Sequence, residues 1–199
     1  MGKTILQCGV NILESIPGVG SWKTQDKRFE STGKQTDDSS KCVAYATAGD
    51  CRFYECFHKK FPCDVFSMSH MNVVELPLCR DMDCFGDFFD SKGNEWPRKN
   101  KLCLMRKLLP VFNDISVNCA DLPLLIFKNR KDCLHETQFC SILGVRKNRF
   151  AVDRITSLKS YPAVLPRKAG MTTTERDYVY SELSDVRHLM GDKDVCQTK

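Results

Sequence analysis

The pattern of apolar positions along the chain is clearest after Lys99. From there to residue 119 an apolar residue occurs every three or four positions: Leu102, Met105, Leu109, Phe112, Ile115 and Cys119. This spacing places the six residues on one face of an α-helix. Pro110 lies within the run, and we expect it to kink or split the helix, because it has no backbone N–H and its ring crowds the preceding turn.

Two further helices are predicted beyond this one. The first begins near Asp121, a favourable N-cap, with Pro123 in its first turn. Its apolar face consists of Leu122, Leu125 and Ile126. The second lies in the segment TTTERDYVYSELSDVRHLM, where Thr174 and Asp177 form an approximate capping box. Its inner apolar stripe consists of Tyr178, Leu183, Val186 and Met190.

The rest of the chain has weaker patterns. Ala44 and Ala48 lie four positions apart and favour a short helix packed closely against a neighbour. Ser21–Lys41 is polar and is interpreted as a mobile tail, whereas Gly144–Met171 has little periodicity and is interpreted as a linker. Strand patterns are weak, so we predict an all-α fold of disulfide-stapled helical hairpins in a single core domain. Its parts are residues 1–41 (poorly ordered), 42–142 (disulfide-rich core), 143–172 (linker) and 173–199 (C-terminal helix and tail).

Cysteine changes this picture more than any other residue type. The chain has 199 residues, of which 12 are cysteine, and ten of these lie between Cys42 and Cys140. Such a density is typical of a disulfide scaffold, and these scaffolds belong to secreted proteins because the cytosol keeps thiols reduced. We therefore expect an extracellular, secreted protein. The first residues, MGKTILQCGVNILESIPGVGS, make a poor signal peptide, so either the signal is degenerate or, as we favour, the true start is missing from this sequence.

Charge and hydropathy exclude two further classes of protein. No apolar run approaches about 18 residues, so no membrane insertion is expected. The net charge of +5 is only mildly basic, so no nucleic-acid binding is expected either. Basic residues do cluster at Lys92–Lys107 and at Arg146–Arg149. They indicate either a surface for heparin-like or acidic partners or, as is more common, a solvated helix face.

The cysteines leave open one metal-binding alternative. The pairs Cys51/Cys56 and Cys79/Cys84 each enclose four residues, a spacing at which two thiolates can bind one zinc ion. In this interpretation the protein is an intracellular zinc protein, with Cys63, His58 or His70 near the ion. It leaves eight cysteines unexplained, so we prefer disulfides and expect no metal and no cofactor.

No catalytic residue is predicted, and we do not expect an enzyme. The pair His135-Glu136 lacks the second histidine of a zinc-protease helix, and no glycine-rich phosphate loop occurs. The segment FFDSKGNEW departs from a calcium-binding loop because Lys92 stands at its third position, so we interpret Lys92–Asn94 as a turn. The histidines, including His188, are interpreted as surface or structural residues.

The cysteine spacing from Cys42 onward is C-x8-C-x4-C-x6-C-x15-C-x4-C-x18-C-x15-C-x13-C-x6-C. It resembles the stanniocalcin family of secreted hormones, which begins C-x8-C-x4-C-x5-C, one residue shorter in the third interval. The family's F-D-x-x-G block, followed by an aromatic residue and a cysteine, is matched by Phe89, Asp90, Gly93, Trp96 and Cys103. The intervals after Cys103 also agree, and the resemblance covers Cys42–Ile142. The chain departs from the family in the extra Cys84 and in the long interval before Cys196.

The resemblance implies a secreted, hormone-like signalling protein without catalytic activity, of a kind associated in vertebrates with calcium and phosphate homeostasis. It also implies a disulfide-linked homodimer that binds a protein receptor or a secreted protein target. Inhibition of a secreted metalloproteinase on the same scaffold is the alternative function. The family's disulfides, carried over to this chain, are Cys42–Cys56, Cys51–Cys79, Cys63–Cys119, Cys103–Cys133 and Cys140–Cys196.

Two cysteines, Cys8 and Cys84, remain after these five pairs. An exposed unpaired thiol tends to find a partner outside the cell, and in a symmetric dimer the natural partner is the same residue of the other subunit. We therefore predict a Cys84–Cys84 bond between subunits, formed in a polar, exposed loop. The alternatives are Cys8, or the tail cysteine Cys196 as in vertebrate members, in which case Cys84 pairs with Cys140 or Cys8.

Overall fold

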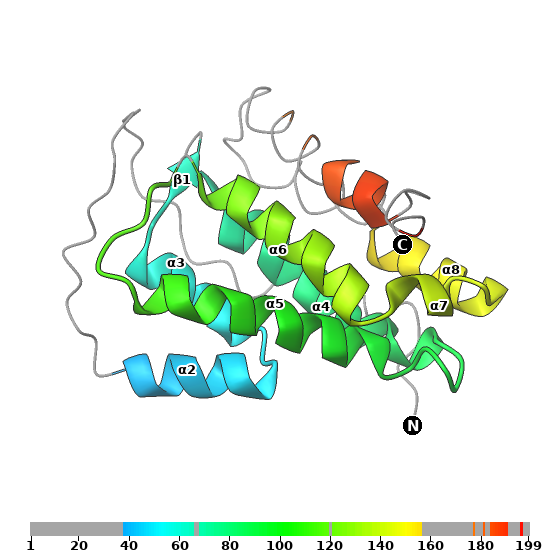
Figure 1. Ribbon diagram of the computed structural model, residues 1–199. Coiled ribbons are helices and arrows are strands. Elements are labelled where there is room, and N and C mark those ends of the chain that lie inside the picture. The colour runs from blue at the N-terminus through cyan, green and yellow to red at the C-terminus, as the bar shows by residue number, and fades with distance from the viewer. Residues whose placement is uncertain are drawn as a thin grey trace.

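The computed structural model describes residues 38–65, 68–119 and 121–156 and, near the C-terminus, residues 177, 181, 184–190 and 196. Helices dominate these residues and pack side by side in a bundle (Figure 1), which confirms the predicted all-α class. The longer helices are α2 (Ser39–Ala48), α3 (Arg52–Lys60), α4 (Leu76–Phe85), α5 (Trp96–Asn113), α6 (Leu122–Glu136) and α8 (Arg146–Ile155). The shorter helical elements are a π-helical turn (Met71–Glu75), a 3₁₀ turn (Gly86–Phe88) and α7 (Phe139–Ile142).

Two short strands interrupt the helices of the described chain. β1 (Asp64–Val65) and β2 (Met68–Ser69) are antiparallel, with Asp64 opposite Ser69 and Val65 opposite Met68. They lie at the end of the bundle opposite α7 and α8 (Figure 1). Among the described helices, none combines the length and the apolar character that crossing a membrane requires.

The helix α5 runs between α2 and α6 and contacts both of them (Figure 1). Its buried stripe includes Leu104, Met105, Leu108 and Phe112. Of the predicted stripe, Met105 and Phe112 are buried, whereas Leu102 and Leu109 lie beside the buried face and are half-buried. The helix ends at Asn113, which leaves Ile115 outside it and 82% exposed. The predicted split at Pro110 is wrong: this proline lies on the exposed side, where water can reach the carbonyl that it leaves without a donor.

The start of α6 was predicted correctly from the sequence. Asp121 is its N-cap and Pro123 lies in the first turn. Leu122 and Ile126 are each 1% exposed, whereas Leu125 is half-buried. A disulfide between Cys103 and Cys133 joins α6 to α5, so these two helices form a covalently closed hairpin.

Two apolar cores fill the bundle. One is rich in phenylalanine, with the rings of Phe53, Phe57, Phe61 and Phe112 at centroid separations of 5.4–6.0 Å. It joins α2, α3, α5 and α6. The other core lies towards α7 and α8, where the rings of Trp96 and Phe139 are 4.9 Å apart. Aromatic pairs at these distances add to the burial of apolar area and fix the angles at which the helices meet.

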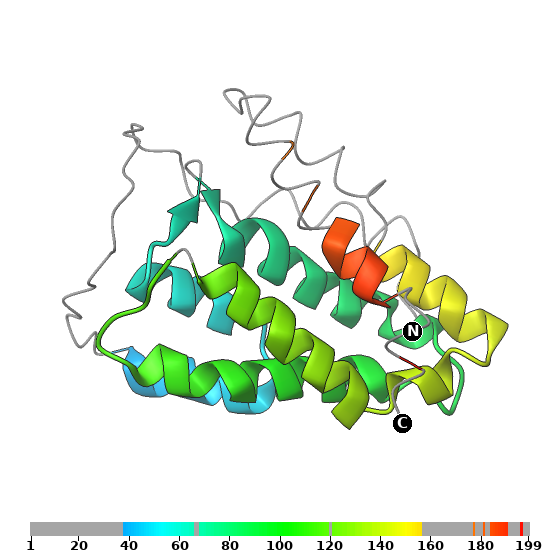
Figure 2. The same ribbon diagram turned by 45° about the horizontal axis from the view of Figure 1, so that its top comes forward.

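The predicted linker after residue 143 is wrong in its first part, where α8 occupies Arg146–Ile155. Its buried face contains Ala151, Val152 and Ile155, and the helical residues 184–190 lie beside it (Figure 2). Of the predicted C-terminal stripe, Val186 and Met190 are buried in the same core, so this part of the prediction is confirmed. Tyr178 and Leu183 fall outside the described residues, as do residues 21–37 of the predicted tail and the rest of the linker. The end of the predicted tail is wrong, because residues 39–41 form the first turn of α2.

The Phe-Asp-x-x-Gly block forms a turn that holds α8 in place. Asp90 Oδ1 accepts hydrogen bonds from the backbone N–H groups of Lys92 (3.2 Å) and Gly93 (2.8 Å). The fully buried Asn148 of α8 accepts the Asp90 backbone N–H and donates to Asp90 Oδ1, both at 2.8 Å. A Cβ at Gly93 would lie 2.7 Å from Asn148 Nδ2, so only glycine lets the amide approach. The predicted turn is thus present, and its role is to dock a helix.

Five disulfides join the described cysteines, with Cα–Cα distances of 5.1–5.8 Å, and they are the five pairs that the family resemblance implied. Cys84 is disulfide-bonded as well, within this one chain. It belongs to α4, not to a loop, and is half-buried against the core. The predicted Cys84–Cys84 bond between subunits is therefore wrong, because the Cys84 sulfur is already in a disulfide of its own chain.

Candidate functional site

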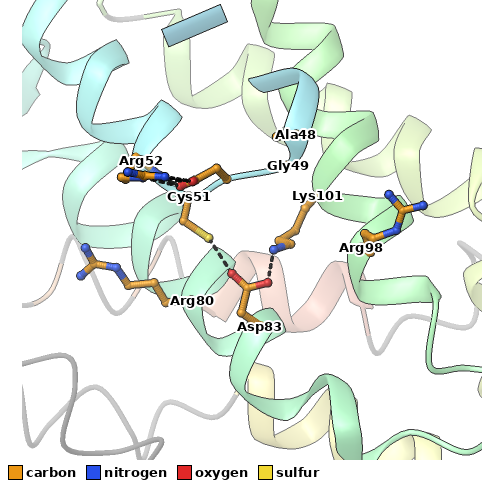
Figure 3. Close-up of a pocket in the computed structure, with 9 residues that line it drawn as sticks. Ala48, Gly49, Cys51, Arg52, Arg80, Asp83, Arg98 and Lys101 are labelled. Atoms are coloured by element: carbon orange, nitrogen blue, oxygen red, sulfur yellow. Dashed lines mark hydrogen bonds and ion pairs between the residues drawn. The ribbon is translucent and has the colours of Figure 1, made fainter. Parts of the chain in front are cut away.

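An open hollow of about 540 Å³ lies where the turn between α2 and α3 crosses α4 and α5 (Figure 3). Three separate parts of the chain line it. The turn contributes residues 48–52, α4 contributes Arg80 and Asp83, and α5 contributes Arg98 and Lys101. The hollow thus carries four basic and two acidic side chains, and it has no aromatic lining.

The turn that forms one wall of the hollow depends on Gly49 and Cys51. Gly49 ends α2 with φ of +73°, a left-handed conformation that favours glycine. Its Cα also lies close to α5, because an added Cβ would be 3.2 Å from the Leu102 side chain. Two residues later Cys51 forms the disulfide to Cys79 and so attaches the start of α3 to α4. These constraints hold the wall against the two helices opposite it.

An ion pair between Lys101 and Asp83 forms the base of the hollow and joins α5 to α4 (Figure 3). The Lys101 side chain is 7% exposed, whereas that of Asp83 is 54% exposed. The second carboxylate oxygen of Asp83 lies 3.2 Å from Cys51 Sγ. Because Cys51 is in a disulfide and has no thiol hydrogen, this is a contact between sulfur and carboxylate rather than a hydrogen bond.

The rim of the hollow carries three arginines that differ in their partners. Arg52 pairs with Asp50, and this hydrogen bond from the guanidinium, outweighing some burial, holds the pKa of the Asp50 carboxyl below its usual range. Arg80 pairs with Glu55 at 2.9 Å. Arg98 is exposed, and within the described residues it forms no ion pair. Of the three rim arginines, only Arg98 can bind a ligand without first releasing a carboxylate of the described chain.

The hollow also contains the only described cluster with the spacing of metal ligands, Cys51, Cys79 and Asp83. Both sulfurs are in one disulfide, so neither is a thiolate that can bind a soft metal ion. The same holds for Cys56, Cys63 and Cys84, which are also disulfide-bonded. The zinc alternative therefore lacks its thiolate ligands in this structure.

The basic cluster at Lys92–Lys107 divides into paired and unpaired side chains. Lys99 pairs with Glu95 at 2.7 Å, and Lys107 pairs with Glu136 at 2.7 Å, in addition to the Lys101 pair at the base of the hollow. Arg98 and Arg106 are exposed and have no ion pair among the described residues. The second cluster, Arg146–Arg149, lies on α8 and presents three exposed basic side chains. Two members of the first cluster, Lys101 and Lys107, thus join α5 to α4 and to α6.

A buried ion pair was not predicted from the sequence. The Nη2 atom of Arg130, in α6, donates to both carboxylate oxygens of Glu75 at 2.6 and 2.5 Å, and His70 Nε2 lies 3.4 Å from Glu75 Oε1. Burial alone would raise the pKa of Glu75, but Arg130 and His70 outweigh it and keep the pKa below its usual range. The carboxylate stays charged and away from solvent, and the pair links the π-helical turn to α6.

The other histidines show no catalytic arrangement within the described chain. His135 and His188 are exposed, and His58 is half-buried in α3. Since every described cysteine is in a disulfide, none of them is available as a nucleophile for a cysteine–histidine pair.

Comparison of the chain with protein-family models, with curated proteins and with solved structures gave no match in any of the three.

Proposed function

We propose that this protein is a secreted, hormone-like signalling protein of the stanniocalcin type, which acts by binding another protein and takes part in calcium and phosphate homeostasis. The observation that carries the proposal is the set of five disulfides. They join the same cysteines that the family resemblance implies, in a helical bundle of the kind it implies.

The oxidation state of the cysteines supports the extracellular part of the proposal. All eleven described cysteines are in disulfides, and such bonds persist in oxidising compartments. Several of them close long stretches of chain: Cys63–Cys119 and Cys140–Cys196 each span 56 positions. A chain with this many long closed loops depends on oxidation for much of its stability.

The described surface supports binding rather than catalysis. The open hollow offers charged side chains fixed by a disulfide and ion pairs, without a nucleophile and base in contact. Fixed charged groups of this kind suit recognition of another protein, because they give specificity and speed association. The proposed assembly is a homodimer, as the resemblance implies.

The test begins with the full chain exported from cells behind a heterologous signal peptide. Its peptides are mapped by mass spectrometry without reduction, and its mass in solution is measured by light scattering. The purified protein is then added to epithelial cells whose calcium and phosphate uptake is followed with radioisotopes. The matched control is the same protein after reduction and alkylation. We expect the five disulfide pairs, a dimer mass, and a change in uptake that the alkylated control does not cause.

Two results would contradict the proposal. Free thiols together with bound zinc in the native protein would refute the secreted scaffold and favour an intracellular zinc protein. Correct disulfides, no effect on ion uptake and inhibition of a secreted metalloproteinase would favour the alternative function. The second result would leave the fold and the disulfide pairs unaffected.

A further inference from the structure

The hollow above the Cys51–Cys79 disulfide has an excess of basic side chains held in a fixed arrangement. We infer that it docks an acidic segment of a protein partner, with a partner carboxylate bound to Arg98. This inference deepens the proposed function by giving the chemistry of the partner, and it rests on that function only in requiring that the partner is a protein.

The first argument is the charge balance of the hollow. Arg52, Arg80, Arg98 and Lys101 line it together with two carboxylates, those of Asp50 and Asp83. With Glu55, which pairs with Arg80 at the rim, the excess is one positive charge. A concave surface with a basic excess attracts negative charge, and guanidinium groups bind carboxylates with two parallel hydrogen bonds. Arg98 is the exposed member without an ion pair among the described residues, so its full hydrogen-bonding capacity is available to a ligand.

The second argument is that the charged groups are already in place. Asp50 orients the guanidinium of Arg52, and Glu55 orients that of Arg80. The disulfide to Cys79 and the ion pair between Lys101 and Asp83 fix the walls relative to one another. Groups that are fixed before binding lose little conformational freedom when a ligand arrives, so more of the interaction free energy appears as affinity.

The third argument identifies a protein segment rather than a uniformly anionic polymer. The carboxylates of Asp50 and Asp83 face the hollow and would repel a sulfated polysaccharide, in which every unit is negative. The same oxygens can accept hydrogen bonds from the backbone N–H groups of a peptide. The volume of about 540 Å³ is that of a site for a few residues.

The test measures binding of a fluorescein-labelled eight-residue peptide, in which glutamate alternates with glycine, to the full, oxidised chain by fluorescence anisotropy. The salt concentration is about 0.05 M, because exposed charges are then weakly screened. The variant is Arg98→Glu, and the matched control is Arg106→Glu. Both residues are exposed, lie on α5 and lack an ion pair among the described residues, but only Arg98 lines the hollow. Both variants change the net charge equally.

We expect Arg98→Glu to weaken binding about tenfold or more and Arg106→Glu to weaken it less than about threefold, because only the first reverses a charge at the contact. Arg98→Gln, which removes the charge without reversing it, should give an intermediate loss. Circular dichroism and a non-reducing peptide map verify that each variant is folded. If all three fail to fold, the same peptide is titrated into ¹⁵N-labelled native protein, and the amide signals of residues 49–52 should shift.

Three outcomes would overturn the inference. The first is an equal loss in Arg98→Glu and Arg106→Glu, which would mean diffuse attraction to the whole surface. The second is no saturable binding of the peptide, or no shift at residues 49–52. The third is Arg98-dependent binding of a heparin octasaccharide but not of the peptide, which would make the partner a glycan. Peptide binding that depends on Arg98, in a protein without effect on ion uptake, would keep this inference and refute the proposed function instead.

Discussion

Replacement of Asp81 by asparagine should stabilise the protein at neutral pH, and the gain should disappear in acid. Asp81 lies in α4 and is 3% exposed. Within the described part of the chain its Oδ2 atom has no hydrogen-bond partner, and burial raises the pKa of its carboxyl from 3.8 to about 7. The folded protein therefore holds a proton at pH values at which the unfolded chain has already released it.

The sign and size of the effect follow from this difference in pKa. Between pH 4 and pH 7 the native state binds more protons than the unfolded state, so the free energy of unfolding falls as pH rises. Each unit of pKa difference corresponds to about 1.4 kcal/mol. The rise in the Asp81 pKa from 3.8 to about 7, caused by burial, therefore amounts to about 4 kcal/mol above pH 7. Asparagine has nearly the same shape and never ionises, so Asp81→Asn should be more stable than the native protein by up to about this amount at pH 8.

The assay is urea unfolding of the oxidised proteins, followed by far-ultraviolet circular dichroism at several pH values from 4 to 8. Asp87→Asn is the matched control, because Asp87 is exposed in the 3₁₀ turn that follows α4, and its substitution should change stability by less than about 0.5 kcal/mol. The difference between Asp81→Asn and the native protein should be near zero at pH 4 and grow towards pH 8. A difference that does not change with pH, or a loss of stability at pH 8, would refute the reasoning.

Two further predictions concern packing and disulfides, and the Arg98 variants above add one on binding. Gly93→Ala should lower the free energy of unfolding by about 2 kcal/mol, because the added Cβ meets the buried amide of Asn148. The control is Gly86→Ala, whose added Cβ meets nothing within 4 Å and should cost little. Thermal unfolding compares the two variants, and equal losses of stability would contradict the docking role of the turn. Removal of the Cys63–Cys119 bond should cost about 4 kcal/mol and removal of the Cys42–Cys56 bond about 3 kcal/mol, because the first closes a longer loop. Equal shifts in melting temperature for the two paired serine variants would contradict this order.

The sequence predicted those elements whose signals are local. The start of α6 was correct because an N-cap and a first-turn proline, Asp121 and Pro123, lie next to the apolar residues that they introduce. The buried face of α5 was predicted only in part, since Phe112 lies in the core whereas Ile115 falls beyond the end of the helix. The helix α8 was missed because its face is centred on a buried polar residue, Asn148, whose partner is elsewhere in the chain.

The candidate site was less predictable than the helices. Its walls come from three elements, and sequence spacing does not show that Arg80 and Arg98 line the same hollow. The pair between Glu75 and Arg130 joins residues 55 positions apart, so no periodic pattern indicates it. The five disulfides were anticipated by resemblance to a family and not by any physical argument from the residues, because ten cysteines permit many pairings.

The contact between the Asp90–Gly93 turn and Asn148 also ties the evolution of distant positions together. Asp90 and Asn148 are 58 positions apart, yet each satisfies hydrogen bonds of the other, and Gly93 leaves the space that the amide fills. A change at one of the three sites removes the advantage of the other two, so they should be inherited as a set. In any collection of related chains, those with a larger residue in place of Gly93 should also have lost the asparagine.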